Sequence, residues 1–372
     1  MTSEQFFESI LEHFNNKLPF AVYRKPNAYE IKSFCQTDDV LYVISDYTES
    51  GFVFSPFDDK QDSVLIPFEK SIYSKCELQE FANHETSQIT QTPSRSQKTQ
   101  HIDLVTKGID AINAQKLQKV VLSRCESVPC EHHPIDVFKR LLQMYPMAFV
   151  YCWYHPKVGL WLGATPETLL TIEGNRLTTM ALAGTKPYQG TIYVDWTKKE
   201  KDEQQLVTYY IIKVLSDMKL EVASSEARPI QAGNLVHIQT IIKTNLKPET
   251  YDLKQLLGNL HPTPAVCGLP KEDAKQFILN NEAYNREFYT GFLGELNIKE
   301  KKTRNSNRHN VENDAYATIK TISNLYVNLR CMQIKPKNAL IYVGGGITID
   351  SSPEAEWEET VHKSLVMKKV FQ

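Results

Sequence analysis

The chain has 372 residues and a mass of 42.7 kDa, with 41% hydrophobic and 23% charged residues, which excludes a disordered or collagen-like protein. Its 42 Lys and Arg residues nearly balance 44 Asp and Glu residues, so the net charge of -2 provides no general basic field for nucleic acid or an anionic membrane. Length alone favours two domains but also permits one large sheet-built domain.

The N-terminal residues 1–20 have the pattern of a short amphipathic helix and lack the features of a secretion signal. No segment approaches the roughly 18 uninterrupted apolar residues of a membrane-spanning helix, so we expect a cytoplasmic protein with no membrane partner. The seven cysteines are scattered without a C-x-x-C pair, which favours reduced, structural cysteines over a zinc or dithiol site.

Helical and strand-like patterns follow one another along the chain, with a polar connector predicted at Glu85–Gln100. In chain order, the patterns after it are a helix at 102–112, a strand from Lys119, a helix at Pro134–Tyr145, strands at 147–155 and 159–165, a hairpin at Leu169–Thr185, helices at Lys198–Met218 and Glu272–Asn280, strands at Phe288–Leu296, Asn324–Ile334 and Ala339–Val343, and a helix after Ser352. Helices are segregated from runs of strands, and consecutive hairpins pair antiparallel. The sequence therefore predicts an α+β fold with large antiparallel β-sheets and helices packed outside.

The segment 297–315, between two strand patterns, is dense in Lys, Arg and Asn. Such a segment suits either a nucleic-acid patch or a long solvated hairpin loop. Because no aromatic side chains interleave with the charges, we predict the loop.

An acid occupies an apolar position on the predicted helix Lys198–Met218. Glu203 falls near the centre of a stripe formed by Leu206, Val207, Tyr210 and Val214. A buried ionised carboxylate needs a cation, a metal or a proton, whereas an acid in the first turns of a helix also suits the helix dipole. Position alone leaves both interpretations open.

Two features near the C-terminus add to this pattern. Glu359 and Lys363 are four residues apart on the last helix, as either an inward-facing charge pair or an ordinary exposed one. The preceding strand runs into Gly344–Gly346, which favours either a tight turn or a carboxylate site. Together with Arg330 and Glu203, these groups indicate a small anionic substrate held partly through a divalent metal, and hard oxygen ligands favour Mg²⁺.

Seven segments together resemble the chorismate-utilising enzymes, which include the synthases of isochorismate, salicylate, anthranilate and aminodeoxychorismate. The segments are KVVLSR (Lys119–Arg124), GATPE (Gly163–Glu167), ALAGT (Ala181–Thr185), LHPTPAVCGLP (Leu260–Pro270), NREFYTGFLG (Asn285–Gly294), LRC (Leu329–Cys331), and GGGI with SSPEAEWEET near the C-terminus. They occur in the family order over roughly two thirds of the chain. The resemblance implies a single domain over 1–372, with a less recognisable part at 1–100, a catalytic core at 101–372 and a loop insertion at 297–315.

Within this family, the resemblance is greatest to the isochorismate synthases of menaquinone and siderophore biosynthesis. Lys119 occupies the position of the lysine base that activates water in isochorismate and salicylate synthases, whereas ammonia-using members carry other residues there. Aminodeoxychorismate synthases that use a lysine nucleophile have Lys in place of Ala183. The resemblance therefore implies a Mg²⁺-dependent isomerase in which Lys119 activates water for attack at C2 of chorismate and Glu167 protonates the departing C4 hydroxyl.

The resemblance also assigns the other site residues. Glu203 and Glu359 match the Mg²⁺ ligands. The substrate-lining positions are Gly184, Thr185, His237, Ala265, Tyr289, Arg330, Gly344 and Lys363. In two places the sequence departs from the family: the loop after Glu295 is longer, and TKPYQG follows the AGT motif where an Arg is often found.

Two alternatives follow from the sequence. A salicylate synthase would form isochorismate and then eliminate pyruvate in the same site. A non-catalytic protein would bind an anion or RNA through the basic segment. The family resemblance favours a monomer that acts on chorismate without an amidotransferase subunit or nucleic acid.

Overall fold

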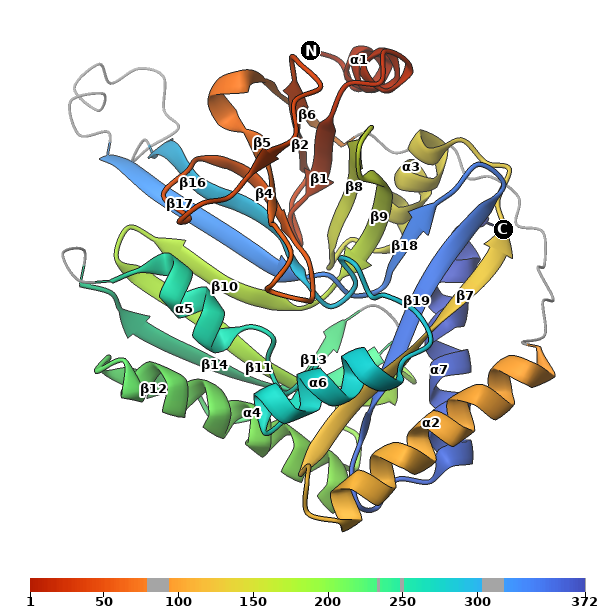
Figure 1. Ribbon diagram of the computed structural model, residues 1–372. Coiled ribbons are helices and arrows are strands. Elements are labelled where there is room, and N and C mark those ends of the chain that lie inside the picture. The colour runs from red at the N-terminus through yellow and green to blue at the C-terminus, as the bar shows by residue number, and fades with distance from the viewer. Residues whose placement is uncertain (79–93, 233–234, 248–250, 303–317, 372) are drawn as a thin grey trace.

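Two antiparallel β-sheets face each other across an aromatic core, and helices lie on their outer sides (Figure 1). This arrangement is given by a computed structural model, which describes residues 1–78, 94–232, 235–247, 251–302 and 318–371. The predicted α+β fold with large antiparallel sheets is confirmed.

The first sheet has nine strands, all paired antiparallel. Their order across the sheet is β15 (Gly268–Leu269), β7 (Lys119–Pro129), β19 (Asn338–Ile347), β18 (Cys331–Ile334), β9 (Gly159–Thr165), β8 (Phe149–His155), β1 (Phe20–Arg24), β2 (Glu30–Gln36) and β6 (Ser71–Glu77). Strands from the two ends of the chain thus meet in one sheet.

The second sheet is ten-stranded. Its order is β12 (Val222–Ser224), β14 (Leu235–Asn245), β11 (Arg176–Pro187), β10 (Thr168–Glu173), β17 (Thr318–Val327), β16 (Phe292–Lys302), β4 (Gly51–Ser55), β5 (Val64–Pro67) and β3 (Tyr42–Val43), and β13 (Arg228–Ala232) pairs with β14. The hairpin predicted at Leu169–Thr185 is confirmed as β10 and β11, whose last paired residues before the turn are Glu173 and Arg176.

Each outer face is covered by its own helices, which bury separate apolar clusters. The first sheet is covered by α1 (Ser3–Asn15), α3 (Pro134–Met144) and the 3₁₀ turn η3 (Lys369–Phe371), and the second sheet by α4 (Lys198–Asp217) and α5 (Leu253–Leu260). Strand β7 is covered by α2 (Arg95–Asn113) and α6 (Lys271–Asn281), and α7 (Pro353–Lys368) lies against β19 beside α2. A further 3₁₀ turn, η1 (Phe68–Lys70), precedes β6. None of the described helices combines the length and apolar character needed to cross a bilayer.

The N-terminal third belongs to both sheets. Its strands β1, β2 and β6 extend the first sheet, while β3, β4 and β5 extend the second. The aromatic core joins them to the rest of the chain, because Phe54 on β4 stacks on Phe288 with ring centroids 4.2 Å apart, and Tyr23 on β1 contacts Phe149 on β8 with ring centroids 5.5 Å apart. Residues 1–78 therefore form part of the sheets that carry the rest of the chain.

Three sequence predictions differ from the structure. The connector predicted at Glu85–Gln100 includes the first turn of α2, which begins at Arg95; residues 79–93 lie outside the described residues. The loop predicted at 297–315 begins later, because β16 continues to Lys302 and residues 298–302 pair with β17; residues 303–317 are not described. The strand predicted at Asn324–Ile334 is two strands in different sheets.

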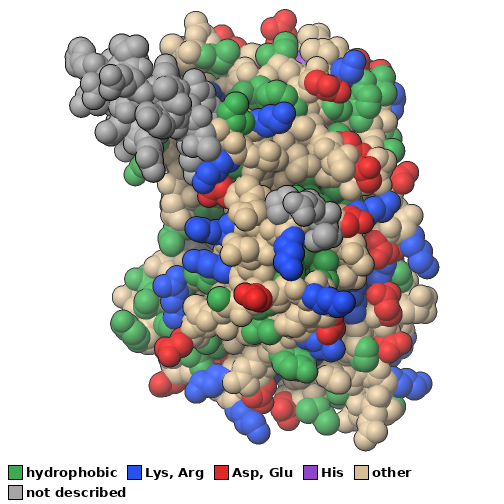
Figure 2. Space-filling view, turned by 90° about the vertical axis from the view of Figure 1, so that its left-hand side faces the viewer, with side chains coloured by type: hydrophobic (Ala, Val, Ile, Leu, Met, Phe, Trp, Pro, Cys, Tyr) green, Lys and Arg blue, Asp and Glu red, His purple; other side chains and the backbone are tan. Residues whose placement is uncertain are grey.

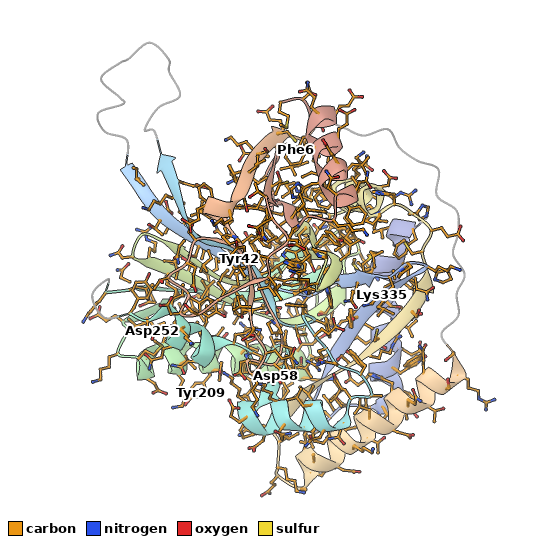
Figure 3. The ribbon with its side chains drawn as sticks, turned by 45° about the horizontal axis from the view of Figure 1, so that its top comes forward. Phe6, Tyr42, Asp58, Tyr209, Asp252 and Lys335 are labelled. Atoms are coloured by element: carbon orange, nitrogen blue, oxygen red, sulfur yellow. The ribbon has the colours of Figure 1, made fainter. Side chains whose placement is uncertain are left out.

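The buried side of α4 also differs from the prediction by one residue. The buried positions are Gln204, Val207, Ile211 and Leu215. Gln204 replaces an apolar residue in this stripe because its amide donates hydrogen bonds to Thr240 on β14 and to Thr208. Tyr209 lies on the outer side of the helix and is 69% exposed (Figure 3). Glu203 consequently lies at the edge of the buried stripe.

Candidate active site

A cavity of about 270 Å³ brings the predicted site residues together. Its walls come from β7 and β19 of the first sheet, β11 and β14 of the second, and the helices α4 and α7. All the residues selected from the sequence line it: Lys119, Glu167, Gly184, Thr185, Glu203, His237, Ala265, Tyr289, Arg330, Gly344, Glu359 and Lys363. Their convergence on one cavity supports a single site of small-molecule size, while their individual roles remain predictions.

Lys119 is the first residue of β7, and only 2% of its surface is exposed. Burial lowers the pKa of its ammonium group; Glu203 opposes this effect, while Lys363 and Lys199 add to it. Its Nζ atom is 3.9 Å from the nearer carboxylate oxygen of Glu203. Lys119 therefore loses its proton more easily than an exposed lysine, and it lines the cavity.

Glu167 lies between β9 and β10 and is 7% exposed. Burial raises the pKa of its carboxyl to about 7, despite the opposing charges of Lys119 and Arg330. Its backbone is fixed by two hydrogen bonds, since its amide donates to Thr165 Oγ1 and its carbonyl accepts from Val327. A carboxyl with this pKa can give up a proton near neutral pH.

Arg330 lies where the chain crosses from the second sheet to the first. The residue has a backbone φ of 46°, in the left-handed region that an arginine rarely adopts, and this bend is why one predicted strand becomes β17 and β18. Burial lowers the pKa of its guanidinium to about 10. The bend thus brings a cationic side chain to the cavity wall.

His237 on β14 connects Arg330 to the AGT segment. Burial lowers its pKa to about 3, so the imidazole is neutral. Nδ1 lies 2.9 Å from the carbonyl oxygen of Gly184 and 3.3 Å from Thr185 Oγ1, and Nε2 lies 3.2 Å from Arg330 Nη2. These partners assign the proton to Nδ1, which donates to Gly184, while Nε2 accepts from Arg330.

The segment Gly344–Gly346 is not a tight turn, which was one of the two alternatives from the sequence, but part of β19. It pairs with Val121–Ser123 on β7. A Cβ at Gly346 would lie 2.9 Å from Lys119 Cε, and one at Gly345 would lie 3.2 Å from a carboxylate oxygen of Glu356. The glycines therefore leave the space that the neighbouring charged side chains occupy.

Tyr289 and Ala265 also line the cavity. Tyr289 is buried and stacks on Tyr342, with ring centroids 5.4 Å apart. A Cβ at Gly344 would lie 3.1 Å from the Tyr289 hydroxyl, so this glycine gives the ring its place. Ala265, in the loop before β15, contributes a small apolar side chain to the wall.

Three carboxylates converge beside the glycine stretch. Glu203 on α4 faces Glu356 and Glu359 on α7, and burial raises its pKa against the opposing effect of Lys119. The ammonium group of Lys363 is 2.6 Å from Glu359 and holds the pKa of that carboxyl below its usual range. The predicted pair of Glu359 and Lys363 thus faces the cavity.

The sequence analysis missed Glu356 and Lys199. Glu356 is 3% exposed, and its Oε1 atom lies 2.9 Å from Lys199 Nζ, which is also 4.0 Å from Glu203. Spacing contained the signal, because Glu356 precedes Glu359 by three residues and Lys199 precedes Glu203 by four, so each shares a helix face with a selected acid.

The carboxylates suit a hard divalent cation. Glu356 Oε2 is buried without a hydrogen-bond partner, which leaves a charged oxygen available to a ligand. In the described part of the chain, no group of three or more His, Cys, Asp or Glu side chains already has the spacing of a metal site, and Lys199 bridges Glu203 and Glu356 instead. Oxygen donors of this kind fit Mg²⁺ better than zinc, provided that Lys199 moves aside.

Surface charge gives little support to a nucleic-acid interface on the face in Figure 2. Lys and Arg side chains are interspersed there with Asp and Glu side chains. Most of the basic segment proposed for RNA binding, 303–317, lies outside the described residues.

Comparison with known proteins gives relatives over most of the chain. The isochorismate synthase EntC of Escherichia coli K12 is 27% identical over 335 residues, which cover 85% of this chain and 79% of EntC. Component 1 of anthranilate synthase from Lactococcus lactis is 25% identical over 372 residues, covering 92% of this chain and 75% of that protein. The solved structure of MenF, the menaquinone-specific isochorismate synthase of Escherichia coli, has a TM-score of 0.72 at 20% identity and covers 95% of this chain and 89% of that one.

The family profile agrees with these relatives. The family described as "Chorismate binding enzyme" matches residues 57–302, and a second profile described in the same words matches residues 319–369. These ranges include the residues of the cavity. The chain therefore belongs to the chorismate-binding enzyme family.

Proposed function

We propose that this protein is an isochorismate synthase, which isomerises chorismate to isochorismate with the help of Mg²⁺. The observation that carries the proposal is that Lys119 and Glu167 are buried in the lining of one cavity and have opposite pKa shifts. Burial favours the neutral forms of both groups, which are the forms that a base and an acid need before the reaction. Named isochorismate synthases among the relatives support the same activity.

Substrate binding falls to the cationic side chains. Chorismate carries two carboxylates, and Arg330 and Lys363 are the cavity cations that suit the enolpyruvyl carboxylate. Lys363 Nζ also donates to the Gly344 carbonyl at 2.9 Å, which fixes its direction. His237 orients the guanidinium of Arg330 by accepting one of its N–H groups.

The chemical step exchanges one hydroxyl for another. Neutral Lys119 takes a proton from a water molecule as that oxygen bonds to C2 of the ring and both ring double bonds shift by one position towards C4. The C4–O bond breaks with its electron pair, and Glu167 protonates the departing hydroxyl to give water. One water enters and one leaves, so the net reaction is an isomerisation.

The acids Glu203, Glu356 and Glu359 would hold the Mg²⁺ ion in this proposal. When bound, the ion would neutralise the ring carboxylate of the substrate. Lys199 lies 2.9 Å from Glu356, so its ammonium group can balance the acids when no cation is present.

The identity of the nucleophile separates this proposal from the ammonia-using members of the family. A buried lysine with a lowered pKa is suited to deprotonating water, whereas ammonia needs no such base. Ala183 in the cavity wall removes the alternative of a lysine nucleophile at that position. We therefore propose water addition without an amidotransferase subunit, by a protein that acts as a monomer.

Product analysis tests the proposal. Purified protein is incubated with chorismate, with and without Mg²⁺ and with and without ammonium, and the products are separated by chromatography. We expect isochorismate in a Mg²⁺-dependent reaction. Stoichiometric pyruvate with salicylate would make the protein a salicylate synthase, anthranilate formed with ammonium would make it an anthranilate synthase, and no turnover would support the binding-protein alternative.

Two variants test the assigned base. Lys119→Ala should lower kcat by about 10²- to 10⁴-fold, the usual contribution of a general base. Lys75→Ala, at an exposed lysine on β6, is the matched control and should behave as wild type. Unchanged turnover in Lys119→Ala would contradict the proposed mechanism.

A further inference from the structure

Arg286 lies behind the cavity, between α6 and β16, and only 2% of its surface is exposed. All five of its N–H groups have acceptors. Nε and one Nη2 proton donate to the two oxygens of Glu282 at 2.7 and 2.6 Å, and the second Nη2 proton donates to the Val121 carbonyl at 2.7 Å. Both Nη1 protons donate at 3.1 Å, to the Val266 carbonyl and to Thr290 Oγ1.

Three of these partners belong to different walls of the cavity. Val121 is on β7, two residues from Lys119; Val266 follows Ala265; and Thr290 follows Tyr289. Arg286 itself does not line the cavity. One guanidinium therefore holds three walls together from the side opposite the substrate.

The ion pair of Arg286 and Glu282 also provides hydrogen-bond partners for β7 beyond the end of its neighbour β15. The edge strand β15 pairs with β7 only at Lys119 and Val120. Beyond this point the Val121 carbonyl accepts from Arg286, while the Ser123 amide donates to Glu282 at 2.8 Å. Side chains thus satisfy the edge of β7 where backbone would otherwise be required.

Thr290 is held in a strained conformation at the same place. Its φ of 61° lies in the left-handed region, which is unusual for a β-branched residue. Arg286 binds its hydroxyl, its carbonyl lies 2.9 Å from His261 Nε2, and its amide donates to the Asn328 carbonyl. The conformation persists because these bonds fix the residue on all sides.

We propose that Arg286 is a positioning residue for the reaction, which sets the distance between the Lys119 strand and the walls that carry Ala265 and Tyr289. The inference rests on the proposed function, because its kinetic test measures the conversion of chorismate to isochorismate. Lysine cannot replace arginine in this role, because a compact ammonium with three donors can pair with Glu282 but cannot also reach all three walls.

The test compares Arg286→Lys with wild type in kcat, KM and thermal unfolding. If Arg286 only balanced the charge of Glu282, Arg286→Lys would have the thermal stability and the kcat of wild type. Positioning predicts a folded variant whose kcat falls about 10²-fold, the effect of a base displaced by about 1 Å, while KM changes less than threefold because Arg330 and Lys363 are untouched. Wild-type kcat in a folded Arg286→Lys protein would overturn the inference.

A second pair of variants covers the case in which Arg286→Lys does not fold. Thr290→Val removes only the hydroxyl that Arg286 holds, and Thr290→Ser keeps it. We expect kcat to fall about tenfold in Thr290→Val and by clearly less in Thr290→Ser, which keeps the hydroxyl; equal kcat values would overturn the inference. Lys275→Met, which breaks the buried 2.9 Å pair with Asp58 outside the cavity, is the control for lost stability and should keep its kcat (Figure 3 labels Asp58).

Methyl NMR separates this inference from the proposed function. Signals of Val121, Val266 and Thr290 should all shift in Arg286→Lys and not in Lys275→Met, whatever product the enzyme makes. Unshifted methyl signals would contradict positioning even if wild type makes isochorismate. If wild type made a product other than isochorismate, the proposed function would be contradicted, but the methyl shifts would still test whether Arg286 positions the three walls.

Discussion

Replacing Gly346 by Ala should impair the chemical step while leaving the fold intact. A Cβ at this position would lie 2.9 Å from Lys119 Cε and 3.3 Å from its Nζ. Ordinary carbon contacts are about 3.5–4.0 Å, so the end of the lysine must move by about 0.6–1.1 Å. The lysine side chain is flexible, and Gly346 has no positive φ, so the strand itself can accept alanine.

The expected effect follows from this displacement. Misplacing a reacting group by about 1 Å costs on the order of 10²-fold in rate, which corresponds to about 2.7 kcal/mol of activation free energy. Steady-state kinetics with chorismate should therefore show kcat about 10²-fold lower, with a thermal unfolding midpoint near that of wild type.

The matched control is Gly258→Ala on α5. A Cβ at Gly258 would meet no atom within 4 Å, so this variant should keep full activity, and removing a helix glycine should stabilise it by up to about 1 kcal/mol. Wild-type kcat in a folded Gly346→Ala protein would refute the assignment of Lys119 as the base, because the substitution must displace that side chain.

Three further predictions concern protons and metal. Glu167 must be protonated to act, so kcat/KM should fall as the pH rises through about 7. Lys119 must be neutral, so kcat/KM should rise with pH as Lys119 loses its proton, at a pKa below the usual value for lysine. In a pH–rate profile of Glu167→Gln, the fall in kcat/KM near pH 7 should be absent. Glu203→Gln should weaken Mg²⁺ binding in calorimetric titration about 10- to 100-fold, whereas Glu30→Gln on β2, far from the cavity, should leave it unchanged, and equal affinity in both would contradict the metal assignment. Burial lowers the pKa values of His101, His237 and His261 to about 4, 3 and 4. Near pH 6.5 the unfolded chain therefore binds protons at these histidines that the native state does not bind, and the free energy of unfolding should fall as the pH drops from about 6.5 towards 4. Urea unfolding that does not depend on pH in this window would contradict the burial of neutral histidines.

Local patterns predicted much of the fold. The hairpin predicted at Leu169–Thr185 is formed by β10 and β11, and the helix predicted after Ser352 is α7, which begins at Pro353. What local patterns do not contain is the partner of each strand, and the break at Arg330 between two sheets depends on that partner. The sheet order was therefore beyond the sequence.

The candidate site was predictable because most of its residues lie in segments that resemble a known family, and the cavity includes every residue selected from the sequence. Charge pairs across elements were not. Spacing places Glu356 on the same helix face as Glu359, but its pairing with Lys199 joins two helices far apart in the chain, and Arg286 acquires its role only because β7 has no described strand on its β15 side beyond Val120. Such roles arise from tertiary contacts between residues far apart in the sequence.

The central claim is that water activated by Lys119 enters the ring at C2 while the C4 hydroxyl leaves. Turnover of unlabelled chorismate in oxygen-18 water, followed by mass spectrometry and carbon NMR of the product, measures this directly. The account predicts isochorismate with one oxygen-18 atom, bonded to C2, and no label in the carboxylates. Isochorismate without the label at C2 would show that the hydroxyl moves within the substrate and would contradict the role of Lys119.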